Sequence, residues 1–436
     1  MAWGQRAGVQ DLLDRLSQPA TAKSLYVLST RKITEADAKR LAESIAVNAQ
    51  LEELYLSGHR LGQEGLQAFA DCIAVNTTLK HLCVGEDSLG DEGVKVLCDG
   101  IARNTNSGLQ IWDLEHKSIA LAGAAALGKL LETNTTLHTL TISRNALGDE
   151  AIGELLAGSR ANPQPALKHL LATDIGVTGA ALEHFASLLK VSTCSLESLQ
   201  LSFNGLESAT TTFFDALASN TSLKKLHLKD CKLNDTHAEA LGNALKQNAT
   251  LEEIDLSDNS LTPAACAALA EGLKKNATLK SLNLGNNKCQ DAGAILIGQA
   301  LAANASTSKL AYLDLSKNEL THTGIIALIE SSPVKELHVF NNTIGTGLHE
   351  LLPVLTANHC IEHLDVGANQ LHGALSIALF DAIHSHPTLK TLEMGGNSLG
   401  EDGHEALDRL RQANRGLDVA VDKNAQDENG NFNFEK

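Results

Sequence analysis

The sequence predicts an α/β solenoid with a parallel β-sheet on its concave face and helices on its convex face. The first observation is a period, because one pattern recurs about every 28 residues along the chain. The second is a change of spacing within each repeat, from the two-residue period of a strand to the 3.6-residue period of a helix. Such repeats pack mainly on their neighbours, so the 436 residues are expected to form one elongated array.

The strand half of the repeat is clearest between residues 251 and 257. Ile254 and Leu256 stand two residues apart and therefore share one face of the strand. The charged Glu253 and Asp255 alternate with them and fall on the opposite face. This alternation is typical of a strand that is buried on one side only.

The helix half of the repeat follows the strand half. Its apolar residues recur at helical spacing, at Ala265, Ala268, Leu269 and Leu273. Asn276 comes after the last helical turn, where a left-handed residue is commonly needed and where Asn is the usual substitute for Gly. We therefore expect Asn276 and its equivalents to end the helices in the left-handed conformation.

Stacking these units in one direction makes the strands parallel and about 4.8 Å apart, whereas packed helices need about 8–10 Å. This mismatch curves the stack and places the sheet inside. The line LxxLxLxxNxLxxxG, with its helical half and its period, resembles the ribonuclease-inhibitor-like class of leucine-rich repeats from about Leu51 to Leu417. The resemblance implies a leucine-rich repeat solenoid, or horseshoe, that binds proteins.

We divide the chain into three parts. Residues 1–50 are expected to form an N-terminal cap helix and a degenerate first repeat, and residues 51–416 to form thirteen leucine-rich repeats. Residues 417–436 are expected to form a degenerate strand and a polar tail. The repeats begin at Leu51, Leu79, Leu109, Leu137, Leu167, Leu196, Leu223, Leu251, Leu279, Leu310, Val334, Ile361 and Leu389.

The two ends of the array need caps. The N-terminal cap is expected to be a short amphipathic helix whose apolar face carries Val9, Leu12, Leu13 and Leu16. In the first repeat, Tyr26 and Leu28 are expected at the strand positions of the pattern. In the polar tail, Phe432 and Phe434 either cover the last repeat or dock on a partner as a short linear motif.

One asparagine recurs after the strand of many repeats. The resemblance implies that its side chain turns inward and bonds backbone groups at the bend, so that its loss costs about 1–3 kcal/mol. Cys231 matches the alternative residue of the family at this position, whereas His59, Asp87, Lys117 and Ile175 depart from the pattern. The asparagines are Asn145, Asn204, Asn259, Asn287, Asn318, Asn342, Asn369 and Asn397.

Composition argues against several kinds of partner and site. The formal net charge of −17 disfavours nucleic acid and favours a protein partner with a basic or mixed surface. The eight cysteines form no CxxC pair and no zinc-type spacing, so we expect reduced thiols in the cytoplasm. No apolar run is long enough for a signal peptide or a membrane span, so no membrane contact is expected.

Local motifs give no sign of catalysis. The sequence contains no Walker loop, no GxSxG and no HExxH, so we expect neither an enzyme nor a cofactor. His384 and His386 form an HxH pair that could bind a metal ion, but such a pair is more often part of a loop, and we expect no metal. Helix ends carry six N-x-S/T sequons, where a structural role is favoured over glycosylation: Asn76, Asn134, Asn220, Asn248, Asn276 and Asn304.

A partner protein is expected to bind the concave strand face. In the middle strands, Lys225, His227 and Lys229 form a basic row. This row lies beside Glu253 and Asp255, and neighbouring strands of opposite charge are expected to pair with each other. Later strands combine exposed aromatic and charged residues, which is typical of a binding hot spot. The predicted partner-binding residues are Tyr312, Asp314, Glu336, His338, Phe340, His363 and Asp365.

Three functions are compatible with these features. The one we favour is a non-enzymatic scaffold that binds a partner protein on the concave face. The second is a GTPase-activating protein that resembles the Ran-specific activators, although those are typically followed by a strongly acidic tail and this chain ends in a mixed one. The third is a docking subunit of a large assembly such as a ciliary or flagellar axoneme, with a cytoskeletal or ciliary location.

Overall fold

The computed structural model describes residues 8–18, 22–330 and 333–421. The chain divides into two compact units, residues 1–213 and residues 214–436, and each unit is described by itself. The predicted division at residues 50 and 416 concerns the kind of repeat and stays a prediction. The phenylalanines of the predicted tail lie outside the described residues.

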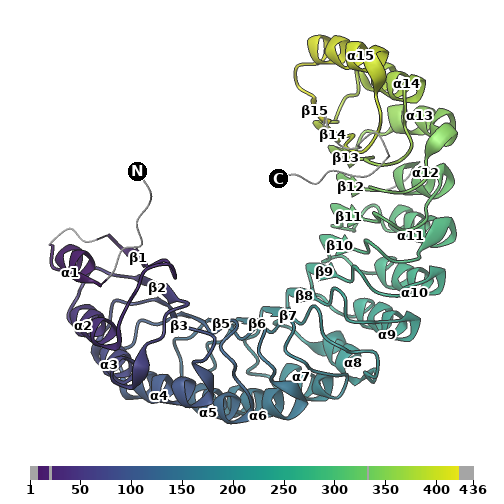
Figure 1. The fold of residues 1–436 in the computed structure, drawn as a ribbon. Coiled ribbons are helices and arrows are strands. Elements are labelled where there is room, and N and C mark those ends of the chain that lie inside the picture. The colour runs from purple at the N-terminus through teal and green to yellow at the C-terminus, as the bar shows by residue number, and fades with distance from the viewer. Residues whose placement is uncertain (1–7, 19–21, 331–332, 422–436) are drawn as a thin grey trace. The chain divides into compact units, whose positions relative to one another are not determined.

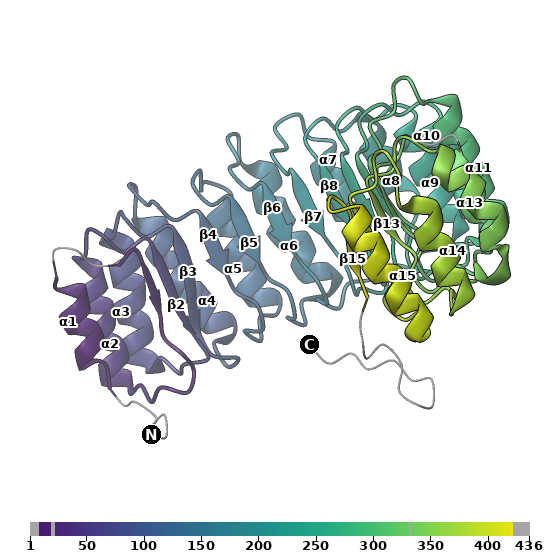
Figure 2. The ribbon, with the colours of Figure 1, turned by 90° about the horizontal axis from the view of Figure 1, so that it is seen from above.

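Strands and helices alternate along the first unit. Each strand from β1 to β7 pairs in parallel with the next strand in the sequence. The helices lie on one side of these strands (Figure 1, Figure 2). The elements are α1 (Gln10–Leu16), β1 (Ser24–Tyr26), α2 (Glu35–Ala46), β2 (Glu53–Ser57), α3 (Gly62–Val75), β3 (His81–Gly85), α4 (Gly90–Arg103), β4 (Ile111–Asp113), α5 (Leu121–Leu131), β5 (Thr139–Thr141), α6 (Gly148–Ala161), β6 (His169–Leu171), α7 (Ala181–Leu189) and β7 (Ser198–Gln200).

The second unit repeats this arrangement, with parallel pairing from β8 to β15 in sequence order. The predicted α/β solenoid is thereby confirmed in both units. The elements are α8 (Thr212–Ser219), which begins two residues before this unit, β8 (Lys225–His227), α9 (Asp235–Leu245), β9 (Glu253–Asp255), α10 (Pro263–Leu273), β10 (Ser281–Asn283), α11 (Gln290–Ala303), β11 (Tyr312–Asp314), α12 (His322–Glu330), β12 (Glu336–His338), the 3-10 helix η1 (Gly345–Gly347), α13 (Leu348–Ala357), β13 (His363–Asp365), α14 (Ala374–Ile383), β14 (Thr391–Glu393), α15 (Gly400–Ala413) and β15 (Asp418–Ala420).

The apolar core lies between the strands and the helices. In the repeat that starts at Leu279, the strand side contributes Leu282 and Leu284, and both are fully buried. The helix side contributes Ala294 and Ile297 of α11, which are also fully buried. The predicted change from two-residue spacing to helical spacing therefore supplies both halves of the core.

The first repeat has a different register from the predicted one. Leu25 and Val27 are the buried residues of this strand region. Tyr26 and Leu28 are instead 62% and 74% exposed. The pairing of β1 with β2 places Leu25 beside the buried Leu54. Because side chains alternate along a strand, this shift of one residue puts Tyr26 and Leu28 on the open face of the sheet.

The recurring asparagine is turned inward as predicted, and it joins neighbouring repeats. Asn318 is fully buried, and its side-chain nitrogen donates to the carbonyl oxygens of Leu284 (2.8 Å) and Ser316 (3.0 Å). Its side-chain oxygen accepts from the backbone N–H of Cys289 (3.0 Å). The same bond to a carbonyl of the preceding repeat is made by Asn145, Asn204, Asn259, Asn287, Asn342, Asn369 and Asn397.

Three of the positions that depart from the asparagine pattern are also buried. The Nε2 atom of His59 lies 3.3 Å from the carbonyl oxygen of Val27, and the Nζ atom of Lys117 donates to Ser57 Oγ at 3.0 Å. Ile175 is buried without any polar group to offer. At this position, the side chains of His59 and Lys117 therefore each make a polar contact, whereas the apolar side chain of Ile175 makes none.

The asparagines that end the helices differ from the prediction, because they are not left-handed. Asn76, at the end of α3, has φ −72° and ψ 133°. Its side-chain nitrogen donates to the backbone oxygens of Ile45 (2.9 Å) and Asn48 (3.2 Å) in the preceding repeat. Its side-chain oxygen accepts from the backbone N–H of Leu79 (2.8 Å). Asparagine stands here because its amide joins two repeats, and a second row of bridging asparagines runs along the helix ends.

One set of left-handed residues lies after the strands, directly before the inward asparagines. They are Arg144, Phe203, Asp258, Asn286, Lys317, Asn341, Ala368 and Gly396, all with positive φ. A left-handed residue at this point turns the chain sharply away from the strand. The sharp turn in each repeat therefore follows the strand, not the helix.

The sequon residues have a structural role, as the sequence suggested. Beside Asn76, the hydroxyl of Thr78 donates to the carbonyl oxygen of Leu51 (3.0 Å), so both polar residues of this N-x-T sequon pair backbone groups. The sequon asparagines that are buried, at 4–5% exposure, are Asn76, Asn220, Asn248, Asn276 and Asn304.

We predict that Asn318→Ala lowers the free energy of unfolding of the second unit by about 1–3 kcal/mol, because it leaves the buried backbone N–H of Cys289 without its acceptor and removes the amide bonds to Leu284 and Ser316. Urea unfolding followed by circular dichroism measures the change. Asn243→Ala is the control, because Asn243 lies exposed on α9 and accepts one bond from Lys246. Equal stability of the two variants would contradict the structural role of Asn318.

Candidate functional site

The predicted partner-binding residues lie together on the open strand face of the second unit. Their side chains come from β11, β12 and β13 and from the residue two positions after β12, and all of them are half-buried. In the sheet, Asp314 pairs with His338 and His338 pairs with Asp365. We call the seven residues the strand-face patch: Tyr312, Asp314, Glu336, His338, Phe340, His363 and Asp365.

His338 is the cation of the strand-face patch. Its Nε2 atom lies 3.0 Å from Glu336 Oε1, and its Nδ1 atom lies 3.6 Å from Asp365 Oδ2. Burial opposes the charge on the imidazole, but the bonds to Asp365 and Glu336 outweigh it and raise the pKa of His338 to about 9. His338 is therefore positively charged at neutral pH.

Tyr312 lies against this cation, with its ring centroid 5.2 Å from that of His338. Burial and the nearby carboxylates of Asp314 and Glu336 raise the pKa of the Tyr312 phenol far above its usual range. The hydroxyl therefore keeps its proton and can donate a hydrogen bond to a partner. An aromatic ring beside a positive charge also gains cation–π stabilisation.

The two aspartates of the strand-face patch have a structural task as well. Asp314 Oδ1 accepts from the backbone N–H of Ser316 (2.7 Å), and Asp365 Oδ1 accepts from that of Gly367 (2.8 Å). These bonds close the turn after each strand. One carboxylate oxygen of each residue is thus used by the fold, and the other oxygen of Asp365 lies near His338.

Phe340 is less exposed than its position in the sequence suggested. A Cβ atom placed on Gly367 would lie 2.7 Å from Cδ2 of Phe340, so the ring packs closely over the bare backbone of Gly367. Tyr312 is half-buried too. The expectation that both rings face solvent without a structural purpose is therefore only partly met, because neighbouring strands cover one side of them. His363 is held in place by a 2.6 Å hydrogen bond between its Nδ1 atom and Thr391 Oγ1.

The basic row of the middle strands is largely neutralised, as predicted. Glu253 binds both Lys225 (2.6 Å) and His227 (2.8 Å) across the strands. Lys229 pairs with Asp258 (3.1 Å). Asp255 instead accepts from the backbone N–H of Ser257 (2.9 Å). One carboxylate oxygen of Asp255 therefore closes a turn, as that of Asp314 does.

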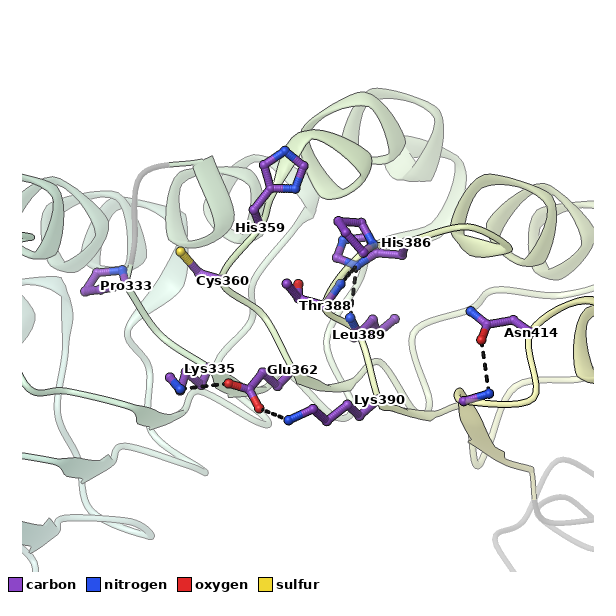
Figure 3. Close-up of a pocket in the computed structure, with 12 residues that line it drawn as sticks. Pro333, Lys335, His359, Cys360, Glu362, His386, Thr388, Leu389, Lys390 and Asn414 are labelled. Atoms are coloured by element: carbon purple, nitrogen blue, oxygen red, sulfur yellow. Dashed lines mark hydrogen bonds and ion pairs between the residues drawn. The ribbon is translucent and has the colours of Figure 1, made fainter.

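A pocket of about 540 Å³ lies in the second unit among the loops that lead into the strands (Figure 3). Glu362 lies between Lys335 (2.8 Å) and Lys390, and their bonds lower the pKa of Glu362 to about 2. The sequence analysis did not find this pocket, although the alternation of Lys335, Glu362 and Lys390 at one repeat position was a usable signal. The pocket is lined by Pro333, Lys335, His359, Cys360, Glu362, His386, Pro387, Thr388, Leu389, Lys390, Asn414 and Gly416.

His386, at the edge of this pocket, occupies a helix-ending asparagine position. Its Nε2 atom lies 3.0 Å from the carbonyl oxygen of Leu355, and its Nδ1 atom accepts from the backbone N–H of Leu389 (3.1 Å). The ring thus carries its proton on Nε2 and bridges repeats as asparagine does elsewhere. Burial lowers the pKa of His386. His384 bonds the carbonyl oxygen of Asp381 in its own helix, so the HxH pair does not converge.

The described residues can also be compared with the requirements of disulfide bonds, metal sites and membrane-spanning helices. None of the eight cysteines, all of which lie in the described part of the chain, forms a disulfide, and Cys360 is exposed in the pocket. Within residues 8–18, 22–330 and 333–421, no group of three His, Cys, Asp or Glu side chains is placed to hold a metal ion. In the same part of the chain, no helix combines the length and the apolar character needed to cross a bilayer.

Comparison with known proteins agrees with the repeat pattern. The model of the TMOD/LMOD leucine-rich domain matches residues 204–319, and a leucine-rich repeat model matches residues 47–70 and 133–156. The chain is similar to ribonuclease inhibitor of Mus musculus, with 26% identity over 238 residues, which cover 54% of this chain and 45% of that protein. The chain is a ribonuclease-inhibitor-like leucine-rich repeat protein.

This leucine-rich repeat protein has two further similarities. One covers only part of its length, and the other concerns its fold alone. It is 30% identical over 137 residues to the capping protein, Arp2/3 and myosin-I linker protein 3 of Rattus norvegicus, which covers 30% of this chain and 10% of that protein. A structure of a TLR13–ssRNA13 complex shares the fold, with TM-score 0.50, 18% identity and coverage of 93% of this chain and 54% of that chain. The chain spans less than half of the ribonuclease inhibitors it matches.

We predict that the second unit loses stability between pH 6.5 and about 9 because His338 loses its proton there. The folded pKa of about 9 exceeds the unfolded value near 6.5, so the stabilisation is complete below pH 6.5 and disappears as the pH passes about 9. With partial exposure and screening, we expect a loss of about 1–2 kcal/mol. Urea unfolding at pH 6 and pH 9.5 measures it.

The same measurements on His338→Gln are expected to show a smaller pH dependence. His404→Gln is the control, because His404 lies exposed on α15. If His338→Gln follows the pH dependence of the unmutated chain, His338 is not held between its carboxylates in solution.

We predict the opposite pH dependence for His386. Its folded pKa lies below the unfolded value near 6.5, so its stabilisation is present above that pH and is lost as the pH falls. The physical reason is that a proton on Nδ1 would face the N–H of Leu389. His386→Asn, which restores the residue found at the other helix ends, is therefore expected to reduce the loss of stability between pH 7.5 and pH 5. Equal losses in both proteins would contradict this role.

Proposed function

We propose that this leucine-rich repeat protein is a non-enzymatic scaffold that binds a partner protein through the strand-face patch of its second unit. The observation that supports it best is the Tyr312–His338 ring pair held among the carboxylates of Glu336 and Asp365. Such a group offers a neutral phenol donor, an aromatic face and negative charge within one small area. Aromatic residues with flanking charges are typical of interface hot spots.

The partner proposed for this patch is a protein with a basic or mixed surface. The patch carries three carboxylates, from Asp314, Glu336 and Asp365, around the cation His338. The net charge of −17 makes the long-range electrostatic field of the chain negative as well, which attracts a basic surface. This charge also disfavours nucleic acid, although the TLR13–ssRNA13 complex shows that another protein of this fold binds RNA.

A cytoskeletal partner is the more specific candidate. It is supported by the match of residues 204–319 to the TMOD/LMOD leucine-rich domain and by the similarity to a linker of capping protein, Arp2/3 and myosin-I. GTPase activation and axonemal docking stay predictions from the sequence, without an observation of their own. Affinity purification of the full chain, followed by binding measurements with the purified partner, tests the candidate directly.

We predict that replacing Tyr312 and Phe340 together by Ser weakens binding of that purified partner by about a hundredfold or more. Each anchor of a hot spot typically contributes about 2 kcal/mol, and about 1.4 kcal/mol corresponds to a factor of ten. Isothermal titration calorimetry measures the dissociation constant. The Phe340 ring packs over Gly367, so the substitution also removes packing within the fold. Thermal melting of the variant measures the stability that is lost in this way.

The matched control is Lys225→Ala with Lys229→Ala, which removes charges that are already paired within the unit. It is expected to change the affinity by less than about tenfold, since an exposed ion pair contributes about 1 kcal/mol or less. If the lysine pair abolishes binding and the aromatic pair leaves it intact, the partner recognises the middle strands and the proposed site is wrong.

A further inference from the structure

A second group of unusual side chains lies on the open strand face of the first unit, far along the chain from the strand-face patch. Tyr26 and Leu28 are 62% and 74% exposed, which is high for large apolar residues next to a sheet. They lie at the end of the first unit where β1 pairs with β2 (Figure 1).

The aromatic side chains of this group are held in a fixed order. The rings of Tyr26 and Tyr55 stack in parallel, with centroids 4.3 Å apart and planes 5° apart. The Tyr55 hydroxyl in turn lies 2.9 Å from His81 Nδ1, and these two rings meet edge to face. Burial, Tyr26 and Glu53 raise the pKa of Tyr55 to about 12, so its hydroxyl keeps its proton. Tyr26 is therefore the outer ring of a supported stack, not a loose surface side chain.

The charge beside this stack is negative. Glu53 lies on β2, and one of its oxygens accepts from Ser24 Oγ (2.7 Å). The neighbouring lysines, Lys23 and Lys80, are both bound to Glu52 at 2.6 Å. Both lysines are thus paired with Glu52. Glu53 therefore gives the open face a negative charge.

The spacing of the exposed residues fits an extended chain. Tyr26 and Leu28 stand two residues apart and alternate with the buried Leu25 and Val27, so their side chains lie about 6.5 Å apart on one face. An extended partner segment presents side chains at the same interval. An arginine side chain stacks on a tyrosine face and binds a carboxylate, because its guanidinium is planar and weakly hydrated. An aliphatic side chain two positions away would lie on Leu28.

We propose that Tyr26, Leu28, Tyr55 and Glu53 form a docking surface for an extended, arginine-containing segment of a partner protein. The guanidinium stacks on the exposed ring of Tyr26, the carboxylate of Glu53 on the same strand face attracts it, and an aliphatic residue two positions from the arginine covers Leu28. The negative charge of the whole chain favours the same partner.

A peptide selection with the full chain tests this surface. Random 12-residue peptides on phage are first depleted on the Tyr26→Ser, Leu28→Ser double variant and are then selected on the unmutated chain. The expected peptides carry an arginine two positions from an aliphatic residue. Measured by fluorescence anisotropy, they are expected to bind the double variant at least tenfold more weakly, and Glu53→Gln at least threefold more weakly. Replacing their arginine by neutral citrulline is expected to cost at least fivefold.

The control is the Val47→Ser, Val75→Ser double variant, which removes two large apolar residues that are 85% and 62% exposed at helix ends. It is expected to change peptide affinity by less than twofold. The proposal is overturned if depletion leaves no binders, or if the selected peptides bind equally well after citrulline replaces arginine.

Two other occupants of the surface are distinguished in the same series. A shift in sedimentation velocity that disappears in the Tyr26→Ser, Leu28→Ser variant would assign the surface to a second copy of the chain. Tighter peptide binding by a Phe432→Ser, Phe434→Ser variant would assign it to the tail of the chain itself. Either result would overturn the proposal of a separate partner.

Discussion

The buried asparagine amide that bridges two repeats is the interaction on which the rest of each unit depends. A chain that leaves a strand and turns sharply exposes N–H and C=O groups that no sheet partner reaches, and burying them unpaired is costly. Asn318 and its equivalents pair these groups after the strands, and Asn76 and its equivalents do so at the helix ends. Both rows reach into the preceding repeat, so each repeat completes the hydrogen bonding of the one before it.

The sequence predicted the repeat well because its signals are local and occur many times. Spacings of two residues and of 3.6 residues depend only on which side chains share a face, and the inward turn of the recurring asparagines was implied by the resemblance to the leucine-rich repeat family. Two local details were wrong. Tyr26 and Leu28 lie on the open face because pairing with β2, and not propensity, sets the register of β1. The helix-ending asparagines bond across repeats, a contact that no single repeat reveals.

The site was harder to predict for a physical reason. A strand-face position can be identified from alternation, but its exposure depends on residues about 28 positions away in the adjacent strand. Phe340 is half-buried because Gly367 leaves space for its ring, and Asp314 and Asp365 each use one oxygen to close a turn. The charge of His338 has the same origin, since it comes from Glu336 and from Asp365 in the next strand.

The two rows of asparagines also determine how each unit responds to force. Solenoids can act as springs, because a small change in the angle between repeats is multiplied along the array. Here the hydrogen bonds that join repeats run both at the turns after the strands and at the ends of the helices, so bending that opens either edge must break buried bonds. The open strand face is thereby kept stiff, and a partner that matches its shape loses little conformational freedom on binding.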